Sequence, residues 1–148
     1  MDVLTSEERS ALMGRIRGRD TKPEIIVRKF LFSRGFRYRI NDPRYPGSPD
    51  IVLPKYRTVI FVHGCFWHGH EGCKLFRYPK TNFEFWYEKV QRNRERDDQK
   101  IKFLKQQGWN VIVIWECQIK NLSNREDFLD GIQMEIRDIE RLSAKSLS

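Results

Sequence analysis

Three histidines and two cysteines lie within eleven consecutive residues, from His63 to Cys73. The segment reads His-Gly-Cys-Phe-Trp-His-Gly-His-Glu-Gly-Cys, and it contains every histidine of the chain. The remaining cysteine is Cys117, which follows Trp115 and Glu116. Imidazole and thiol groups at this density indicate acid–base chemistry, metal binding or both.

Four of these residues have the spacing of a structural zinc site. Cys65, His70 and Cys73 form a Cys-x4-His-x2-Cys pattern, and Cys117 can supply the fourth ligand. A Cys3His set is closed and tetrahedral, so this zinc would be structural and would join the loop to a later segment. The alternative is three thiols that pack as small hydrophobic groups beside a surface histidine. We favour zinc because the spacing fits and no cysteine is left over.

Two histidines remain outside this ligand set, His63 and His68. A neutral imidazole is the usual general base near pH 7. Taken singly, each histidine could equally be a core residue or a partner of a metal ligand. An acid on a neighbouring strand, Asp50, makes a shared catalytic role the better interpretation.

Length and charge limit the class of protein. The 148 residues are enough for one domain with a single core, spanning residues 1–148. With 28 Lys and Arg against 20 Asp and Glu, the net charge is +8, which favours a polyanionic partner such as nucleic acid. The sequence shows no apolar signal core and no membrane-spanning run, so we expect a cytoplasmic protein that contacts no membrane.

Periodicity and capping signals predict an α/β domain. Helices are expected over 5–17, from Thr21 to Arg34, over 81–107 after a capping box at Thr81 and Glu84, and from Asn124 to Leu142. Strands are expected over 36–40, 50–53, 57–62 and 109–115, the last of them buried at the centre of the sheet. Residues 1–19 would form an arm that grips DNA, and 143–148 a frayed tail.

The order of the motifs resembles a known family. Pro49-Asp50, a hydrophobic strand, His-Gly-Cys-Phe-Trp-His-x-His and a later Trp-Glu-Cys are similar to the very-short-patch-repair (Vsr-type) mismatch endonucleases. The resemblance extends from about Arg9 to about Cys117. It implies a restriction-endonuclease-like fold, a mixed central sheet flanked by helices, to which the structural zinc site is added.

The resemblance also implies a catalytic Mg²⁺ held by Asp50 and by the backbone carbonyl of Val62. The family often has threonine at the Val62 position, so a carbonyl ligand survives this difference, whereas a hydroxyl ligand would not. Asn93 and Asp97, four residues apart on a predicted helix, would lie beside the water shell of the metal.

The histidines would then carry the proton chemistry. His68 would be the general base on the attacking water, and His63 would lie beside the same phosphate. Restriction-type nucleases carry acid-x-Lys on the second strand, whereas this chain has Phe61-Val62-His63, as Vsr-type enzymes do. Glu24 has two compatible roles, since it can close a capping box with Thr21 and, by resemblance, faces the catalytic centre.

Aromatic residues would read the substrate. Phe66 and Trp67, between a zinc ligand and the base, could wedge between base pairs, with Trp86 beside them. The alternative for these rings is core packing. Met13 matches a family residue that enters the base stack from the arm. The resemblance implies a monomer that nicks one strand beside a T:G mismatch left by deamination of 5-methylcytosine, in association with a cytosine-5 DNA methyltransferase and with mismatch-repair proteins.

Two other functions fit part of the pattern. A zinc-stapled DNA-binding module without catalysis would use the charge, the zinc motif and the rings equally well. It gains little from a carboxylate at Asp50, which repels the DNA backbone. A restriction-type endonuclease on matched DNA would share the fold.

Overall fold

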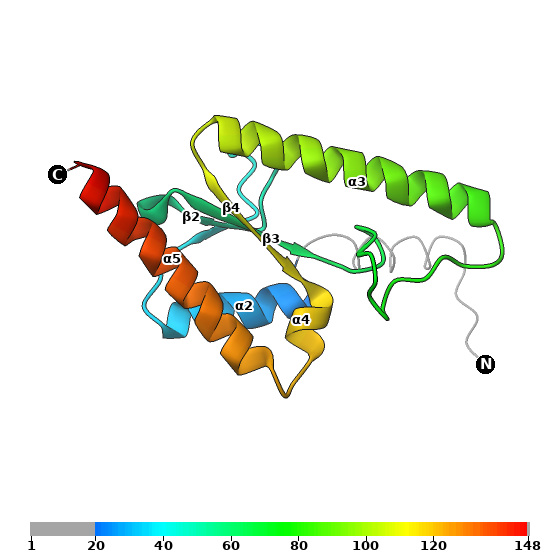
Figure 1. Ribbon diagram of the computed structural model, residues 1–148, viewed down its shortest axis with the longest axis horizontal. Coiled ribbons are helices and arrows are strands. Elements are labelled where there is room, and N and C mark those ends of the chain that lie inside the picture. Colours follow the sequence, from blue (N-terminus) through cyan, green and yellow to red (C-terminus); the bar gives the residue numbers. More distant parts are fainter. Residues whose placement is uncertain (1–19, 148) are drawn as a thin grey trace.

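The computed structural model describes residues 20–147 as a single small α/β domain (Figure 1). The N-terminal arm over 1–19, its predicted helix and Met13 lie outside the described residues. The elements follow in the order α2 (Lys22–Ser33), β1 (Arg39–Ile40), β2 (Ile51–Leu53), the 3₁₀ helix η1 (Pro54–Tyr56), β3 (Thr58–His63), α3 (Phe83–Gln106), β4 (Asn110–Trp115), α4 (Glu116–Lys120) and α5 (Arg125–Leu147).

The four strands form one mixed sheet in the order β1-β2-β3-β4. The first two pairings are antiparallel, and β3 and β4 are parallel. The crossover between the parallel strands contains the motif loop, residues 64–82, and then α3. The carboxyl ends of β3 and β4 therefore lie at the same end of the sheet, where α/β proteins commonly place their ligands.

Helices cover both faces of the sheet, as predicted. One core packs β2, β3 and β4 against α2 and α5, with Leu31 and Ile136 fully buried. A smaller core on the opposite face packs Val59 and Phe61 against Leu104 of α3. In Figure 1, α3 lies along one side of the strands, and α2 and α5 lie along the other. The sheet is thus held between two helical layers.

The predicted position of the last strand was wrong. Among residues 20–147, β4 lies at an edge of the sheet, and its burial alternates instead of being complete. The central strand is β3, whose six residues are all buried. Helices contact both faces of β4, so an edge strand here has the continuous apolar sequence that normally marks a central strand.

The helices differ from prediction in three respects: where α3 begins, the presence of α4 and where α5 ends. The capping box at Thr81 is absent, since α3 begins at Phe83 after Asn82, which has a left-handed φ of 58° and makes no side-chain cap. The short helix α4 was not predicted. Helix α5 continues to Leu147, past the expected end at Leu142. Within the described residues, none of the helices has the length and apolar character needed to cross a membrane.

Candidate active site and metal centre

A cavity of about 670 Å³ opens at the carboxyl end of β3. Side chains from α2, the loop before β2, β3, the motif loop, α3 and α4 converge on it. Its lining includes most of the predicted catalytic groups together with several cations: Glu24, Asp50, Val62, His63, His68, Asp97, Lys22, Lys100 and Lys120. The cavity therefore combines carboxylates, imidazoles and ammonium groups in one place.

Asp50 lies just before β2 and reaches across to β3. Its Oδ2 accepts a hydrogen bond from the backbone N–H of Val62 at 2.6 Å, which confirms that the two strands bring this acid to the level of the motif. Burial, and next the nearby charge of Glu24, raise the pKa of Asp50 to about 7. A carboxylate with this pKa needs a compensating positive charge in order to stay ionised at neutral pH.

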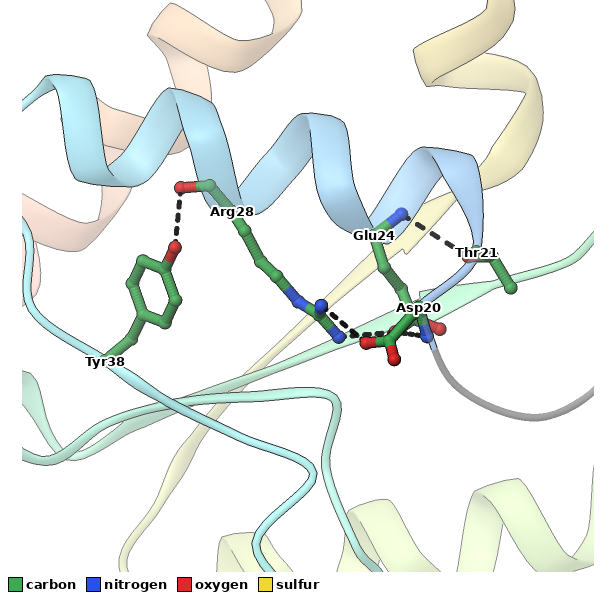
Figure 2. Close-up of polar contacts among 5 residues, drawn as sticks. All are labelled: Asp20, Thr21, Glu24, Arg28 and Tyr38. Carbon is green, nitrogen blue, oxygen red and sulfur yellow. Dashed lines mark hydrogen bonds and ion pairs between the residues drawn. The ribbon is translucent and has the colours of Figure 1, made fainter.

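Glu24 lines the cavity, but the capping box predicted for it with Thr21 is incomplete. Its N–H donates to Thr21 Oγ1 at 3.4 Å, but its carboxylate binds the N–H of Asp20 at 3.1 Å, one residue earlier than a capping box requires. Arg28 bridges Glu24 at 3.0 Å and Asp20 at 2.7 Å. Figure 2 shows this network, in which Tyr38 also donates to the Arg28 carbonyl. Burial raises the pKa of Glu24.

The two remaining histidines form a stacked pair. The rings of His63 and His68 lie 3.8 Å apart at an angle of 3°. Asp97 Oδ2 lies 2.6 Å from His68 Nδ1, an arrangement that favours the tautomer with the proton on Nδ1 and leaves Nε2 available as a base. Burial, and then the nearby His68, lower the pKa of His63 to about 3, so its ring stays neutral at pH 7.

His63, His68 and Asp97 also bring ligand atoms within 4.8 Å of one another, as a metal site would. The stacking argues against one shared ion, because imidazole lone pairs lie in the ring plane. Two parallel rings 3.8 Å apart cannot both direct a lone pair at one point. We therefore interpret this group as an oriented acid–base pair beside a neutral histidine.

The four predicted zinc ligands converge as one cluster. His70 Nδ1 lies 3.6 Å from Cys65 Sγ and 3.5 Å from Cys117 Sγ, and Cys73 belongs to the same group. A tetrahedral zinc with bonds of about 2.0–2.3 Å separates its ligand atoms by roughly 3.6 Å, so the donor set fits zinc. Burial is the largest of the causes that raise the pKa of the Cys65 thiol, so a thiolate there needs a cation beside it.

Helix α3 fixes the motif loop from one side. Asn93 donates to the Trp67 carbonyl at 2.8 Å, and Arg94 Nε donates to the Gly69 carbonyl at 3.0 Å. Gly69 has a φ of +62°, and a Cβ there would collide with Arg94 and Val90, so only glycine allows this approach. Asn93 thus holds the loop directly, while its predicted place near a metal's water shell stays a prediction.

The predicted stacking residues form an aromatic cluster at the cavity mouth, defined here as Phe66, Trp67 and Trp86. Their ring centroids lie 5.1 to 5.9 Å apart, and all three residues are partly exposed. The rings pack on each other, on Phe76 and on Phe85, and lie outside the two cores of the described residues. Phe66 and Trp67 also line the cavity itself.

Comparison with known proteins identifies the family. Residues 1–74 match the family model described as DNA mismatch endonuclease Vsr. The chain is 50% identical over 137 residues to the Type II nicking enzyme V.NmeAIP of Neisseria meningitidis serogroup A, covering 93% of this chain and 97% of that protein. It is 43% identical over 126 residues to the DNA mismatch endonuclease Vsr of Escherichia coli, covering 85% and 80%. The chain belongs to the Vsr family.

This Vsr-family chain is therefore a hydrolase, a DNA nicking endonuclease of the Vsr type. The interpretation as a non-catalytic zinc-stapled module is wrong. The catalytic assignments of individual residues stay predictions that the geometry now makes specific.

Several residues at the Vsr-type site were not singled out from the sequence. Glu116 Oε1 accepts from the Cys65 N–H at 3.2 Å, and its other oxygen pairs with Lys120 at 2.9 Å. Lys100 lines the cavity beside Asp97. The Trp-Glu-Cys motif contains Glu116, and its position beside the predicted ligand Cys117 is the sequence signal for it. No local pattern marks the two lysines.

Replacing Asp97 by asparagine should lower the single-turnover nicking rate by about 10²–10⁴-fold, the range of general-base catalysis. The amide would no longer favour the required tautomer of His68 or stabilise its protonated form. DNA affinity should be unchanged or slightly higher, because a negative charge is lost. Asp98→Asn, on the exposed side of the same helix, is the matched control. A loss confined to DNA affinity would contradict this role.

Proposed function

We propose that this enzyme is a Mg²⁺-dependent, strand-specific endonuclease that nicks duplex DNA beside a T:G mismatch, built on a restriction-endonuclease-like fold. The observation that carries the proposal is the shared cavity, which places Asp50 and Glu24 with the His68–Asp97 pair next to the aromatic cluster. Phosphodiester hydrolysis needs a held cation, a base for water and a fixed backbone.

The cavity suits a hard divalent cation. Asp50 and Glu24 are acids whose pKa values are both raised, mainly by burial, and Asp50 further by the charge of Glu24. Mg²⁺ prefers such oxygen ligands and relieves this repulsion. Asp50 and the Val62 carbonyl would hold the ion, and Asn93 and Asp97 would lie beside its water shell. When bound, Mg²⁺ stabilises charge on the phosphate and the leaving oxygen.

Side chains of the protein carry out the other roles in the reaction. His68 takes the proton of the attacking water, and Asp97 orients its ring and stabilises the charge that the ring then acquires. The neutral ring of His63 packs against His68 and lies beside the phosphate. Lys100 and Lys120 add positive charge at the cavity wall and attract the DNA backbone.

The aromatic cluster supports mismatch preference. Flat, partly exposed rings can enter a base step that has opened, and a mismatched step opens at lower cost than a matched one. The printed names of the family model and of the Escherichia coli relative include mismatch endonuclease. Because T:G pairs arise from 5-methylcytosine, the proposal includes association with a cytosine-5 DNA methyltransferase and with mismatch-repair proteins. A single set of candidate catalytic groups among the described residues suits a monomer that cuts one strand.

The test uses purified protein and end-labelled duplexes that carry either T:G or T:A at one position, with Mg²⁺ or with a chelator. The proposal expects one nick, in one strand beside the mismatch, only with Mg²⁺. Equal cutting of T:A duplex on both strands would favour the restriction-type alternative. Nicking at full rate in the chelator would contradict the catalytic role of Mg²⁺.

Trp67→Ala should weaken binding to T:G duplex by about 1–3 kcal/mol, the scale of one base–aromatic stack, and weaken binding to T:A duplex less. Zinc content and melting temperature should stay unchanged, because the ring is not a ligand and lies outside both described cores. Phe103→Ala, which removes an exposed ring far along α3, is the control. A lower melting temperature with unchanged T:G preference would show that Trp67 serves packing.

A further inference from the structure

Trp115 occupies a position that neither zinc binding nor proton transfer explains. It is the last residue of β4 and pairs in register with His63, the last residue of β3. Its ring stacks on the ring of His70 at 4.0 Å and 6°. The same ring meets His63 edge-on at 5.2 Å and 76°. Trp115 therefore lies between a predicted zinc ligand and a predicted catalytic histidine.

The contacts continue on both sides of Trp115. His63 stacks on His68 at 3.8 Å, and His68 is bonded to Asp97 at 2.6 Å. His70, Trp115, His63 and His68 thus form one uninterrupted series of rings, which we name the ring ladder. The ladder begins inside the Cys3His cluster and ends at the proposed base.

Hydrogen bonds fix the backbone on both sides of Trp115, in the middle of the ladder. The Trp115 N–H donates to Gln118 Oε1 at 2.8 Å, and Glu116 binds the Cys65 N–H at 3.2 Å. The two hydrophobic cores of the described residues do not contain the Trp115 side chain. Its ring contacts are with the two histidines, so a role as core filler does not account for it.

We infer that Trp115 is a positioning residue for the nicking reaction, which fixes the plane of His63, and through it that of His68, relative to the zinc centre. The inference rests on the proposed role of His68 as the base. It explains why the zinc ligands and the catalytic histidines alternate within one short loop. Rings packed on a rigid centre hold the base within a few tenths of an ångström, and a misplacement of about 1 Å can cost about 10²-fold in rate.

Trp115→Leu should lower the single-turnover nicking rate by about 10–100-fold while the Kd for T:G duplex stays within about twofold of wild type. Trp115→Phe, which keeps a flat ring, should recover most of the rate. Zinc should remain at one per chain in both variants. The matched control is Trp109→Leu, just before β4 begins, where the ring packs on Tyr45 and Arg57 and on no histidine among its recorded ring contacts.

The ring-proton chemical shifts of His63 and His68 supply a second measurement that does not depend on activity. In wild-type protein these protons should be displaced by the stacked rings, and Trp115→Leu should shift both sets while Trp109→Leu shifts neither. If Trp115→Leu does not fold, Trp115→Met takes its place. Should neither fold, His63 protons at unstacked positions in the wild-type spectrum would still overturn the inference.

The outcomes separate this inference from the proposed function. A wild-type enzyme that does not nick T:G duplex with Mg²⁺ refutes the proposed function itself. A wild-type enzyme that nicks, together with a folded Trp115→Leu variant of wild-type rate and unchanged His68 signals, refutes the inference alone. A Trp115→Leu variant that loses DNA affinity but no rate at saturation would also overturn it.

Discussion

Asp50→Asn should abolish nicking, with a loss of at least about 10³-fold in the single-turnover rate, while the Kd for duplex DNA changes little. The amide keeps the hydrogen bond from Val62 but carries no charge to hold Mg²⁺. Losing several kcal/mol of charge stabilisation from the metal corresponds to this factor. The cations and the aromatic cluster that are proposed to bind DNA remain in place.

The control is Asp138→Asn, which removes an exposed carboxylate on α5. Denaturing gels under enzyme excess give the rate, and fluorescence anisotropy gives the Kd. Nicking by Asp50→Asn at near wild-type rate would exclude Asp50 from the metal site. Loss of DNA binding in parallel with the rate would show a structural defect instead.

The same substitution should make the protein more stable at neutral and alkaline pH when no metal is added. Folding raises the pKa of Asp50 from 3.8 to about 7, so the folded state binds its proton more tightly than the unfolded state. Stability linked to this proton is present at low pH and is lost as the pH rises from about 4 to 7. The difference in unfolding free energy between Asp50→Asn and the wild-type protein should therefore grow over that range, to at most about 4 kcal/mol. Urea unfolding at pH 4, 6 and 8 measures it, and an advantage independent of pH would contradict the assignment.

Cys73→Ala should lower the melting temperature by at least about 10 °C and abolish binding of one tightly held zinc ion per chain. Structural zinc binding contributes directly to folding, with apparent free energies of about 10–16 kcal/mol in isolated zinc-finger peptides. Loss of a few kcal/mol shifts the melting of a domain of this size by roughly this amount. Three of the four predicted zinc ligands lie in the motif loop 64–82, and the fourth, Cys117, lies outside it. Within the described residues this loop contains no strand, so it should be the first part to lose structure.

Glu71→Ala, an exposed substitution in the same loop, is the control for this zinc variant. Metal analysis by mass spectrometry and thermal melting by circular dichroism are the two measurements. The Cys73→Ala variant should also nick slowly, since His68 lies in the loop that the zinc holds. A wild-type protein purified without zinc, yet as stable as the zinc-loaded form, would refute the structural site.

Local sequence patterns were sufficient to predict most helices and strands and to predict which residues of the histidine–cysteine motif come together. The period and the turn signals located β2, β3 and the long helix α3 to within a few residues. Cys65, His70 and Cys73 are close in sequence, so a short loop can bring them to one point, and their convergence with Cys117 was predicted correctly. A tight antiparallel connection also sufficed to predict that Asp50 lies level with the end of β3, where its carboxylate accepts from the Val62 N–H.

The tertiary structure decided which side chains meet across distant segments. Asp97 bonds to His68 from 29 residues away, Glu116 holds the Cys65 N–H across 51 residues, and Trp115 lies between His63 and His70. Such contacts depend on helix rotation and strand order, which no local period specifies. The edge position of β4 is of the same kind, because a strand covered on both faces is apolar whether or not a neighbour lies beyond it. Local patterns therefore predict which groups are candidates for the chemistry, and packing between distant segments decides how those groups are oriented.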